Sequence, residues 1–246
     1  MTAIKICGIT NVDDAFAAAQ AGVDMLGFIF YPKSLRYVQP ETATFIVGAV
    51  RGSLGVHRPR FVGVFVDEPV TRVRCLLDAV GLDLAQLHGD EPPTEIRELS
   101  PRAFKAIRPQ TQTEAQGALD TYQGSMPGAP SLPQLLVDAY HPQQLGGTGH
   151  RASVDVACWL KGRVRLLLAG GLTPDNVAAA VEQIQPWGVD VSSGVERRPG
   201  IKDPARIRAF IQAVRSADDS GGIAKRRPSL PQTRDSRARY PEKSQL

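Results

Sequence analysis

Chemically reactive side chains recur at one kind of place in this sequence, where a short apolar run ends. Cys7 closes the run AIKIC, His88 closes LAQLH, Arg108 follows AFKAI, and Asp138 closes QLLVD. A thiol can act as a base, a carboxyl group as an acid or a base, and an imidazole or a guanidinium can bind anions. Any one of them alone is equally well explained as a structural residue, and free cysteines are usually buried and inert. Their shared position favours an active-site rim.

The segments that must position these side chains alternate between strand and helix patterns. Strands are predicted at residues 3–7, 25–30, 60–66, 84–88, 103–107, 134–138, 165–169 and 188–192. Helices are predicted at residues 12–21, 41–50, 69–80, 92–99, 112–121, 153–160, 174–184 and 203–215. A capping side chain or a proline marks several helix starts, among them Asn11, Thr173–Pro174 and Asp203–Pro204.

Strict alternation of strand and helix implies a parallel sheet with right-handed crossovers. An open sheet is one solution, but eight units within residues 1–215 match the usual size of a closed barrel. No GxGxxG motif follows the first strand, which counts against a dinucleotide-binding sheet. We therefore predict an α/β protein with one catalytic (βα)8 TIM barrel over residues 1–215. The active site of such a barrel lies where its strands end.

Two glycine-rich stretches near the end of the predicted barrel, LAGGLTPDNV and VDVSSGVE, share a design that suits phosphate. Each strand runs into small residues that leave backbone N–H groups accessible, and the first stretch then enters a helix. We expect Gly171, Ser193 and Gly194 to hold a phosphate group through the backbone; the alternative is a pair of ordinary turns. A third stretch, GGTGH at 146–150, is either a mobile loop over the mouth or a plain surface loop.

Composition narrows the class of protein further. The net charge of +4 arises mostly in residues 216–246, where seven basic residues stand against four acidic ones. That tail is rich in Pro, Ser and Gly, so we expect it to be disordered and expect no nucleic-acid partner. The three cysteines are far apart and form no metal-binding or disulfide pattern, which favours a reducing cytoplasm and no metal site. No apolar run is as long as a membrane span.

Read in order, the motifs at the strand ends resemble one known family. The segments KICGIT, GFIFYPKSLRYV, VGVFVD, QLHGDE, LLVDAY with GGTG, AGGLTPDNV and VDVSSGVERRPGIKD are similar to those of phosphoribosylanthranilate isomerases of tryptophan biosynthesis. The resemblance runs from Lys5 to about Arg215. It implies an Amadori rearrangement of N-(5-phosphoribosyl)anthranilate to 1-(o-carboxyphenylamino)-1-deoxyribulose 5-phosphate, without cofactor or metal. We expect a cytoplasmic monomer or homodimer.

The resemblance also implies roles for individual residues. It makes Cys7 the general base, Asp138 the general acid and Arg36 the anchor of the anthranilate carboxylate. We include His88 and Asp190 among the side chains expected to contact the substrate, although His88 is equally well explained as structural. The chain departs from the family pattern in the segment after GGTG, in a long connection before residue 134, and in the tail.

A thiol that serves as a base must spend time as a thiolate, and Lys5 offers one reason for it to do so. Lys5 and Cys7 are two residues apart on one strand, so both should face the barrel interior. A nearby ammonium favours the thiolate. The alternative is that Lys5 is neutralised by Asp190, which by the same alternation can face inward from the last strand.

Other functions compete with this one. An indole-glycerol-phosphate synthase would need a lysine at a strand end as its acid, and a phosphopentose epimerase would need metal-binding histidines. The strand ends show neither. A barrel that only senses a phosphate ligand would not need both Cys7 and Asp138. Activity on a related aminoaldose of histidine biosynthesis remains open at this stage.

Overall fold

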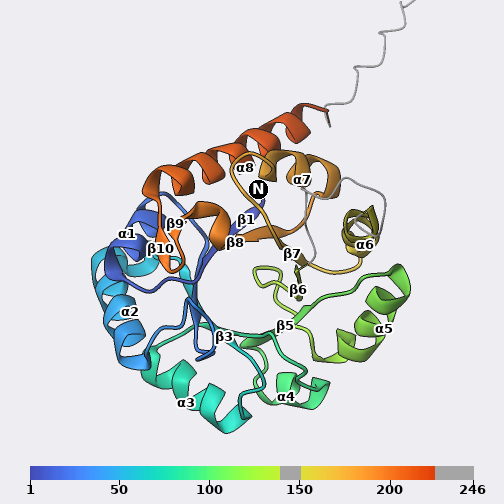
Figure 1. Cartoon of the computed structure of the whole chain (residues 1–246). Helices are drawn as coiled ribbons and strands as arrows, with labels where there is room; N and C mark the ends of the chain where they lie inside the picture. Colours follow the sequence, from blue (N-terminus) through green and yellow to red (C-terminus); the bar gives the residue numbers. More distant parts are fainter. Residues whose placement is uncertain (139–150, 225–246) are drawn as a thin grey trace, which may run out of the picture.

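The computed structural model describes residues 1–138 and 151–224, and its centre is a closed barrel of eight parallel strands ordered β1 to β8. The strands are β1 (Ala3–Cys7), β2 (Met25–Ile29), β3 (Arg60–Phe65), β4 (Leu84–Leu87), β5 (Ala103–Ile107), β6 (Leu135–Asp138), β7 (Leu166–Ala169) and β8 (Gly188–Val191). Figure 1 looks along the barrel and shows the helices as a ring around it. The predicted (βα)8 barrel is confirmed.

Each strand is followed by a helix that packs against the outside of the barrel. The helices are α1 (Val12–Gln20), α2 (Pro40–Leu54), α3 (Val70–Val80), α4 (Pro93–Glu98), α5 (Gln112–Tyr122), α6 (Arg151–Leu160), α7 (Val177–Ile184) and α8 (Pro204–Ala224). Asn11 caps α1 as expected, and Asp203 accepts hydrogen bonds from the first turn of α8. Within the described residues, no helix combines the length and the hydropathy that a membrane crossing requires.

Apolar side chains cover both faces of the strands, which explains why the strands read as continuous hydrophobic runs. The barrel interior is filled by a cluster that includes Met25, Val62, Leu84, Phe104, Leu136 and Leu167. A larger cluster joins the outer strand faces to the helices. Ile4 and Ile6 belong to the outer cluster, so the alternate residues Lys5 and Cys7 face the interior.

The barrel closes where β1 pairs with β8. In that register Lys5 lies opposite Asp190, while on its other side Cys7 lies opposite Gly27 of β2. Because all eight strands are parallel, their carboxyl ends meet at one end of the barrel. The side chains singled out in the sequence are therefore gathered at that end.

Three helix boundaries differ from the prediction by more than two residues. The helix α2 ends at Leu54 rather than at residue 50. The helix expected from residue 174 begins at Val177, since the amide of Asn176 folds back to accept from the Thr173 N–H. The tail was expected from residue 216, but α8 runs on to Ala224, so residues 216–224 are helical. Asp218 on this extension accepts hydrogen bonds from the backbone N–H (2.9 Å) and hydroxyl (2.6 Å) of Thr2. The rest of the tail lies outside the described residues.

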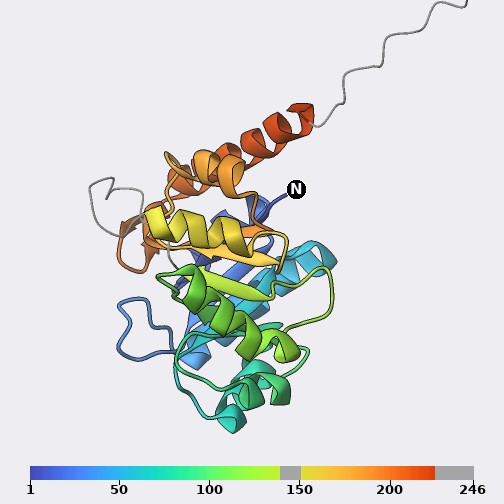
Figure 2. The same ribbon diagram turned by 90° about the vertical axis from the view of Figure 1, so that its right-hand side faces the viewer.

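A short hairpin between β8 and α8 was not predicted. Its strands are β9 (Glu196–Arg198) and β10 (Ile201–Lys202), which pair antiparallel. In the side view of Figure 2 the long helix α8 lies across one end of the molecule, near the N-terminus. The hairpin places Glu196 and Lys202 next to the site described below.

Candidate active site

A cavity of about 290 Å³ collects most of the residues predicted to form the site. Its lining includes Cys7, Arg36, Gln86, His88, Asp138, Gly171, Asp190 and Ser193. These residues come from six different strands or the loops that follow them. Gly194 lines an adjoining cavity that shares Gly171 and Ser193 with the first. The predicted GGTGH loop lies outside the described residues.

Cys7 is buried beside a buried ion pair. Lys5 Nζ lies 3.1 Å from Asp190 Oδ1, so the alternative in which Asp190 neutralises Lys5 describes the structure. Burial raises the pKa of the Cys7 thiol, and the attraction of Lys5 reduces that rise without cancelling it. Burial alone would lower the pKa of Lys5, but Asp190 and Cys7 outweigh it and the pKa is raised. The site therefore presents a neutral thiol next to a fixed positive charge.

Gly27 leaves room for this arrangement. A Cβ at Gly27 would lie 2.8 Å from Cys7 Sγ, closer than real side chains approach, and 3.1 Å from Lys5 Nζ, a tight contact. The thiol and the ammonium thus share the space that a side chain on β2 would otherwise fill. The sequence shows a glycine in MLGFIF, but its contacts with Cys7 and Lys5 depend on how β1 and β2 pair and could not be predicted from the local sequence.

Asp138 at the end of β6 lies between two nitrogen-bearing side chains. His88 Nε2 is 3.6 Å and Arg108 Nε is 3.7 Å from Asp138 Oδ2. On its other side the imidazole Nδ1 lies 2.8 Å from Gln86 Nε2. Arg108 is largely exposed, whereas His88 is mostly covered. Both neighbours stabilise a negative charge on Asp138 once it has lost its proton.

Arg36 is held in place by a carboxylate. Its Nε and Nη2 lie 2.9 Å and 2.8 Å from the two carboxylate oxygens of Glu196, a bidentate pair that fixes the guanidinium plane. Lys202 Nζ lies 2.8 Å from the same carboxylate. Burial raises the pKa of Glu196, but the hydrogen bonds from Arg36 and Lys202 outweigh it and hold the pKa below its usual value. This cluster of two cations and one anion carries a net positive charge.

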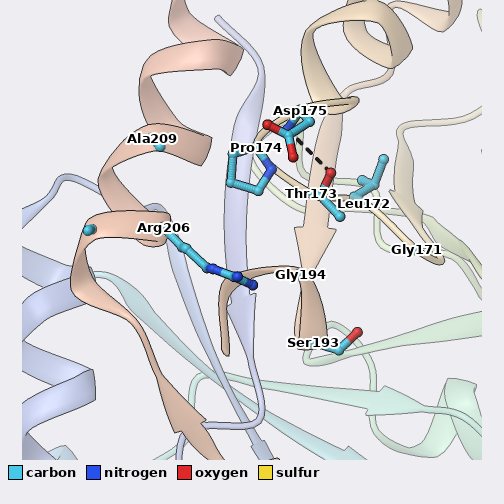
Figure 3. A pocket seen from close by; sticks show the side chains of 10 residues that line it. Gly171, Leu172, Thr173, Pro174, Asp175, Ser193, Gly194, Arg206 and Ala209 are labelled. Atoms are coloured by element: carbon cyan, nitrogen blue, oxygen red, sulfur yellow. Dashed lines mark hydrogen bonds between the residues drawn. The ribbon is translucent and has the colours of Figure 1, made fainter. Parts of the chain in front are cut away.

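The two glycine-rich loops abut one another as expected for a shared anion site. A Cβ at Gly194 would lie 1.9 Å from Leu172 O, so only glycine allows the loop after β8 to lie against the loop after β7. In the part of the chain that the structure describes, the backbone N–H groups of Gly171, Ser193 and Gly194 donate to no protein acceptor. Figure 3 shows Arg206 reaching from α8 toward Gly194. Free N–H groups at such a junction are suited to phosphate.

Three residues near the site were missed by the sequence analysis. Gln86 could have been found by the alternation in LAQLH, which places it inside the barrel between Leu84 and His88. Glu196 and Lys202 stand in the quoted VDVSSGVERRPGIKD, but their pairing depends on a hairpin too short for a strand signal. Among the described residues, no group of histidine, cysteine and acidic side chains is arranged to hold a metal ion.

Comparisons with known proteins point to one family. A family model described as N-(5'-phosphoribosyl)anthranilate (PRA) isomerase matches residues 4–213. An N-(5'-phosphoribosyl)anthranilate isomerase of Citrifermentans bemidjiense is 45% identical over 211 residues, covering 86% of this chain and 96% of that relative. The crystal structure of the phosphoribosyl anthranilate isomerase from Thermotoga maritima is 36% identical, with a TM-score of 0.74 over 88% of this chain and 100% of the other.

A further solved structure is similar and contains a ligand. It is a phosphoribosyl anthranilate isomerase in complex with reduced 1-(o-carboxyphenylamino)-1-deoxyribulose 5-phosphate. It is 35% identical to this chain, with a TM-score of 0.73, and the match covers 88% of this chain and 100% of the other.

Proposed function

Since the chain belongs to the N-(5'-phosphoribosyl)anthranilate isomerase family of tryptophan biosynthesis, we propose that Cys7 and Asp138 are the base and the acid of its aldose–ketose rearrangement. One observation carries this proposal: a thiol on β1 and a carboxyl group on β6 line a single cavity. Arg36 and the two glycine-rich loops line the same space. With its anthranilate carboxylate on Arg36 and its phosphate on the loops, the substrate would place its sugar beside the acid and the base.

The reaction needs both groups. In the first step Asp138 protonates the ring oxygen of the furanose, and the ring opens to a Schiff base. Cys7 then removes the proton on C2, and the resulting enolamine tautomerises to the aminoketone. A positioned acid or base typically contributes ~10²–10⁴-fold to the rate. His88 and Arg108 stabilise the carboxylate that Asp138 becomes after it has given up its proton.

The electrostatic surroundings of Cys7 suit a base that must gain and lose a proton. Because burial raises the pKa of the thiol, it is neutral in the free protein near pH 7. The Lys5 ammonium lies beside it and is held by Asp190, so the charge that stabilises the thiolate cannot move away. Such a fixed charge lowers the cost of forming the thiolate in a buried site.

Arg36 suits its role as carboxylate anchor because of its two neighbours. Glu196 alone would neutralise the guanidinium and leave little attraction for an anion. Lys202 restores one positive charge to the group, so a substrate carboxylate makes the cluster neutral. Glu196 occupies Nε and Nη2, and within the described residues Nη1 is left for the ligand.

The phosphate end relies on the backbone rather than on a cluster of lysines. Backbone N–H groups are offered at two places: by Ser193 and Gly194 at the start of a short 3₁₀ turn, and by Gly171 after β7. Backbone donors do not vary with pH and are already in place before the ligand binds. We also propose a cytoplasmic location, because all three cysteines are free.

The experiment that tests this assignment compares the wild-type protein with Cys7→Ser and Asp138→Asn. Phosphoribosylanthranilate is generated in place, and the loss of its fluorescence is followed. We expect kcat of each variant to fall by at least about 10²-fold. Each variant should still bind the reduced product, which is reduced 1-(o-carboxyphenylamino)-1-deoxyribulose 5-phosphate. Cys75→Ser, a change at an exposed thiol, is the matched control and should keep full activity. Retention of activity by either site variant would refute the role given to that residue.

A further inference from the structure

Gln86 is the polar side chain of the cavity whose hydrogen bonds are incomplete. Gln86 is only 1% exposed, and its side chain lies inside the barrel above Leu84. Its Nε2 lies 2.8 Å from His88 Nδ1, whereas its Oε1 is buried with no hydrogen-bond partner among the described residues. A buried carbonyl without a partner costs about 1–3 kcal/mol, so native proteins rarely keep one without a function.

The other end of the Gln86 amide determines which nitrogen of His88 carries a proton. Because Gln86 donates to Nδ1, that nitrogen must accept, and in the neutral ring the proton then resides on Nε2. Nε2 faces Asp138 Oδ2 at 3.6 Å. A protonated Nε2 has no lone pair with which to accept, so it stabilises the Asp138 carboxylate and cannot take the proton that Asp138 delivers to the substrate.

The position of Gln86 identifies what its free carbonyl meets. Gln86 lines the same cavity as Arg36, Gly171 and Ser193, and through His88 it is adjacent to Asp138. In the proposed function the space beside Asp138 holds the sugar, whose only hydrogen-bond donors besides the amine are hydroxyl groups. A hydroxyl donates to a carbonyl oxygen, which would remove the unpaired group.

We propose that Gln86 is a substrate-positioning residue: its carbonyl oxygen accepts a hydrogen bond from a sugar hydroxyl while its amide holds His88 as the Nε2–H tautomer facing Asp138. This proposal rests on the proposed function. It adds a ligand contact on β4 to the contacts at the two ends of the substrate. The unpaired oxygen is present in the free protein because it is satisfied only when the sugar is bound.

The test uses Gln86→Met, which keeps the shape of the side chain and removes both polar groups. Binding of the reduced product is measured by calorimetry, and we expect about tenfold weaker binding, the loss of one hydrogen bond. The melting temperature should change little, because the loss of the hydrogen bond to His88 Nδ1 is offset by the removal of a buried carbonyl without a partner. Gln116→Met, on the exposed face of α5, is the matched control and should change neither quantity.

The second readout is nitrogen-15 NMR of the histidine side chains above pH 8, with His88→Asn to assign the signal. We expect the wild type to carry the proton on Nε2 of His88, and Gln86→Met to lose that preference. Failure of the wild type to bind the reduced product would overturn the proposed function and leave the tautomer prediction standing. Equal binding by Gln86→Met and wild type, or an Nδ1–H tautomer in the wild type, would each overturn the role of Gln86.

Discussion

Replacing Glu196 by Gln removes the negative charge that holds two cations together. The side chain keeps its shape and one carbonyl oxygen, but its new NH2 group must face either Arg36 Nη2 or Lys202 Nζ, each now 2.8 Å from a carboxylate oxygen. A donor would then meet a donor. Lys202 suffers most, because its side chain is fully buried and its other acceptors are the backbone oxygen and hydroxyl of Ser192.

The size of the effect follows from that burial. Removing one partner of a buried ion pair typically costs 3–5 kcal/mol, since an uncompensated charge is left inside the protein. Arg36 is nearly a quarter exposed and recovers part of its solvation, and Ser192 still accepts from Lys202. We therefore expect the lower end, about 3 kcal/mol, which corresponds to a fall in melting temperature of roughly 6–12 °C for a domain of this size.

The assays are urea unfolding for stability and steady-state kinetics for the site. Because Glu196 also sets the plane of Arg36, KM should rise about tenfold, the equivalent of one charge-assisted hydrogen bond, while kcat falls less. Asp83→Asn is the control: Asp83 binds Arg58 through two oxygens at 2.6 Å and 2.8 Å, and it precedes β4, at the opposite end of the barrel. It should lower stability and leave KM unchanged.

A double substitution tests the reasoning itself. Lys202→Met removes the buried charge that Glu196→Gln leaves without a partner, so the two changes together should cost at least about 1 kcal/mol less than the sum of the single changes. Additive costs would refute the claim that Lys202 is the stranded charge. A loss below about 1 kcal/mol for Glu196→Gln alone would show that the cluster does not stabilise the fold.

Three further predictions follow from the site. Because only the thiolate reacts with iodoacetamide and burial raises the pKa of Cys7, the rate of Cys7 alkylation, followed by mass spectrometry, should still increase with pH beyond 9.0; a rate that levels off below pH 9.0 would contradict the raised pKa. The folded pKa of Glu196 lies below its ordinary value of 4.5, so its contribution to stability is present above that pH and is lost as pH falls, an acid dependence that Glu196→Gln should reduce in urea titrations. Gly8→Ala should raise KM, because its Cβ would lie 2.7 Å from Arg36 Cδ, whereas Gly22→Ala, at a similar positive φ but in open space, should cost stability alone; equal KM values in these two variants would contradict the steric argument.

Much of the fold could be predicted because each strand carries its own signal. The β-branched and aliphatic runs set β1 and β5 to the residue, and the order of elements fixed which side chains stand at strand ends. The identity of Cys7 and Asp138 as rim residues followed from that order alone. Alternation placed Lys5 on the same face as Cys7.

What escaped prediction depends on contacts between distant parts of the chain. Glu196 and Arg36 are 160 residues apart, and no local pattern announces a bidentate pair. The polar composition after residue 216 indicated a disordered tail, yet the described part of that segment is helical because Ala217 is buried and Asp218 binds Thr2. The direction of the Cys7 pKa shift also required the structure, because burial and the nearby ammonium act in opposite directions.

The seam between β1 and β8 has a consequence for the order in which this protein becomes active during synthesis. The thiol on β1 is synthesised well before Asp190, which fixes the ammonium beside it and follows 185 residues after Lys5. Contacts between such distant residues form late, because the loop that joins them is long. A nascent chain arrested before β8 therefore has its thiol but lacks the neighbour that fixes the adjoining charge. Catalytic activity in this protein therefore depends on closure of the barrel between β1 and β8. A defect at that seam should lower the turnover rate before it lowers the helix content.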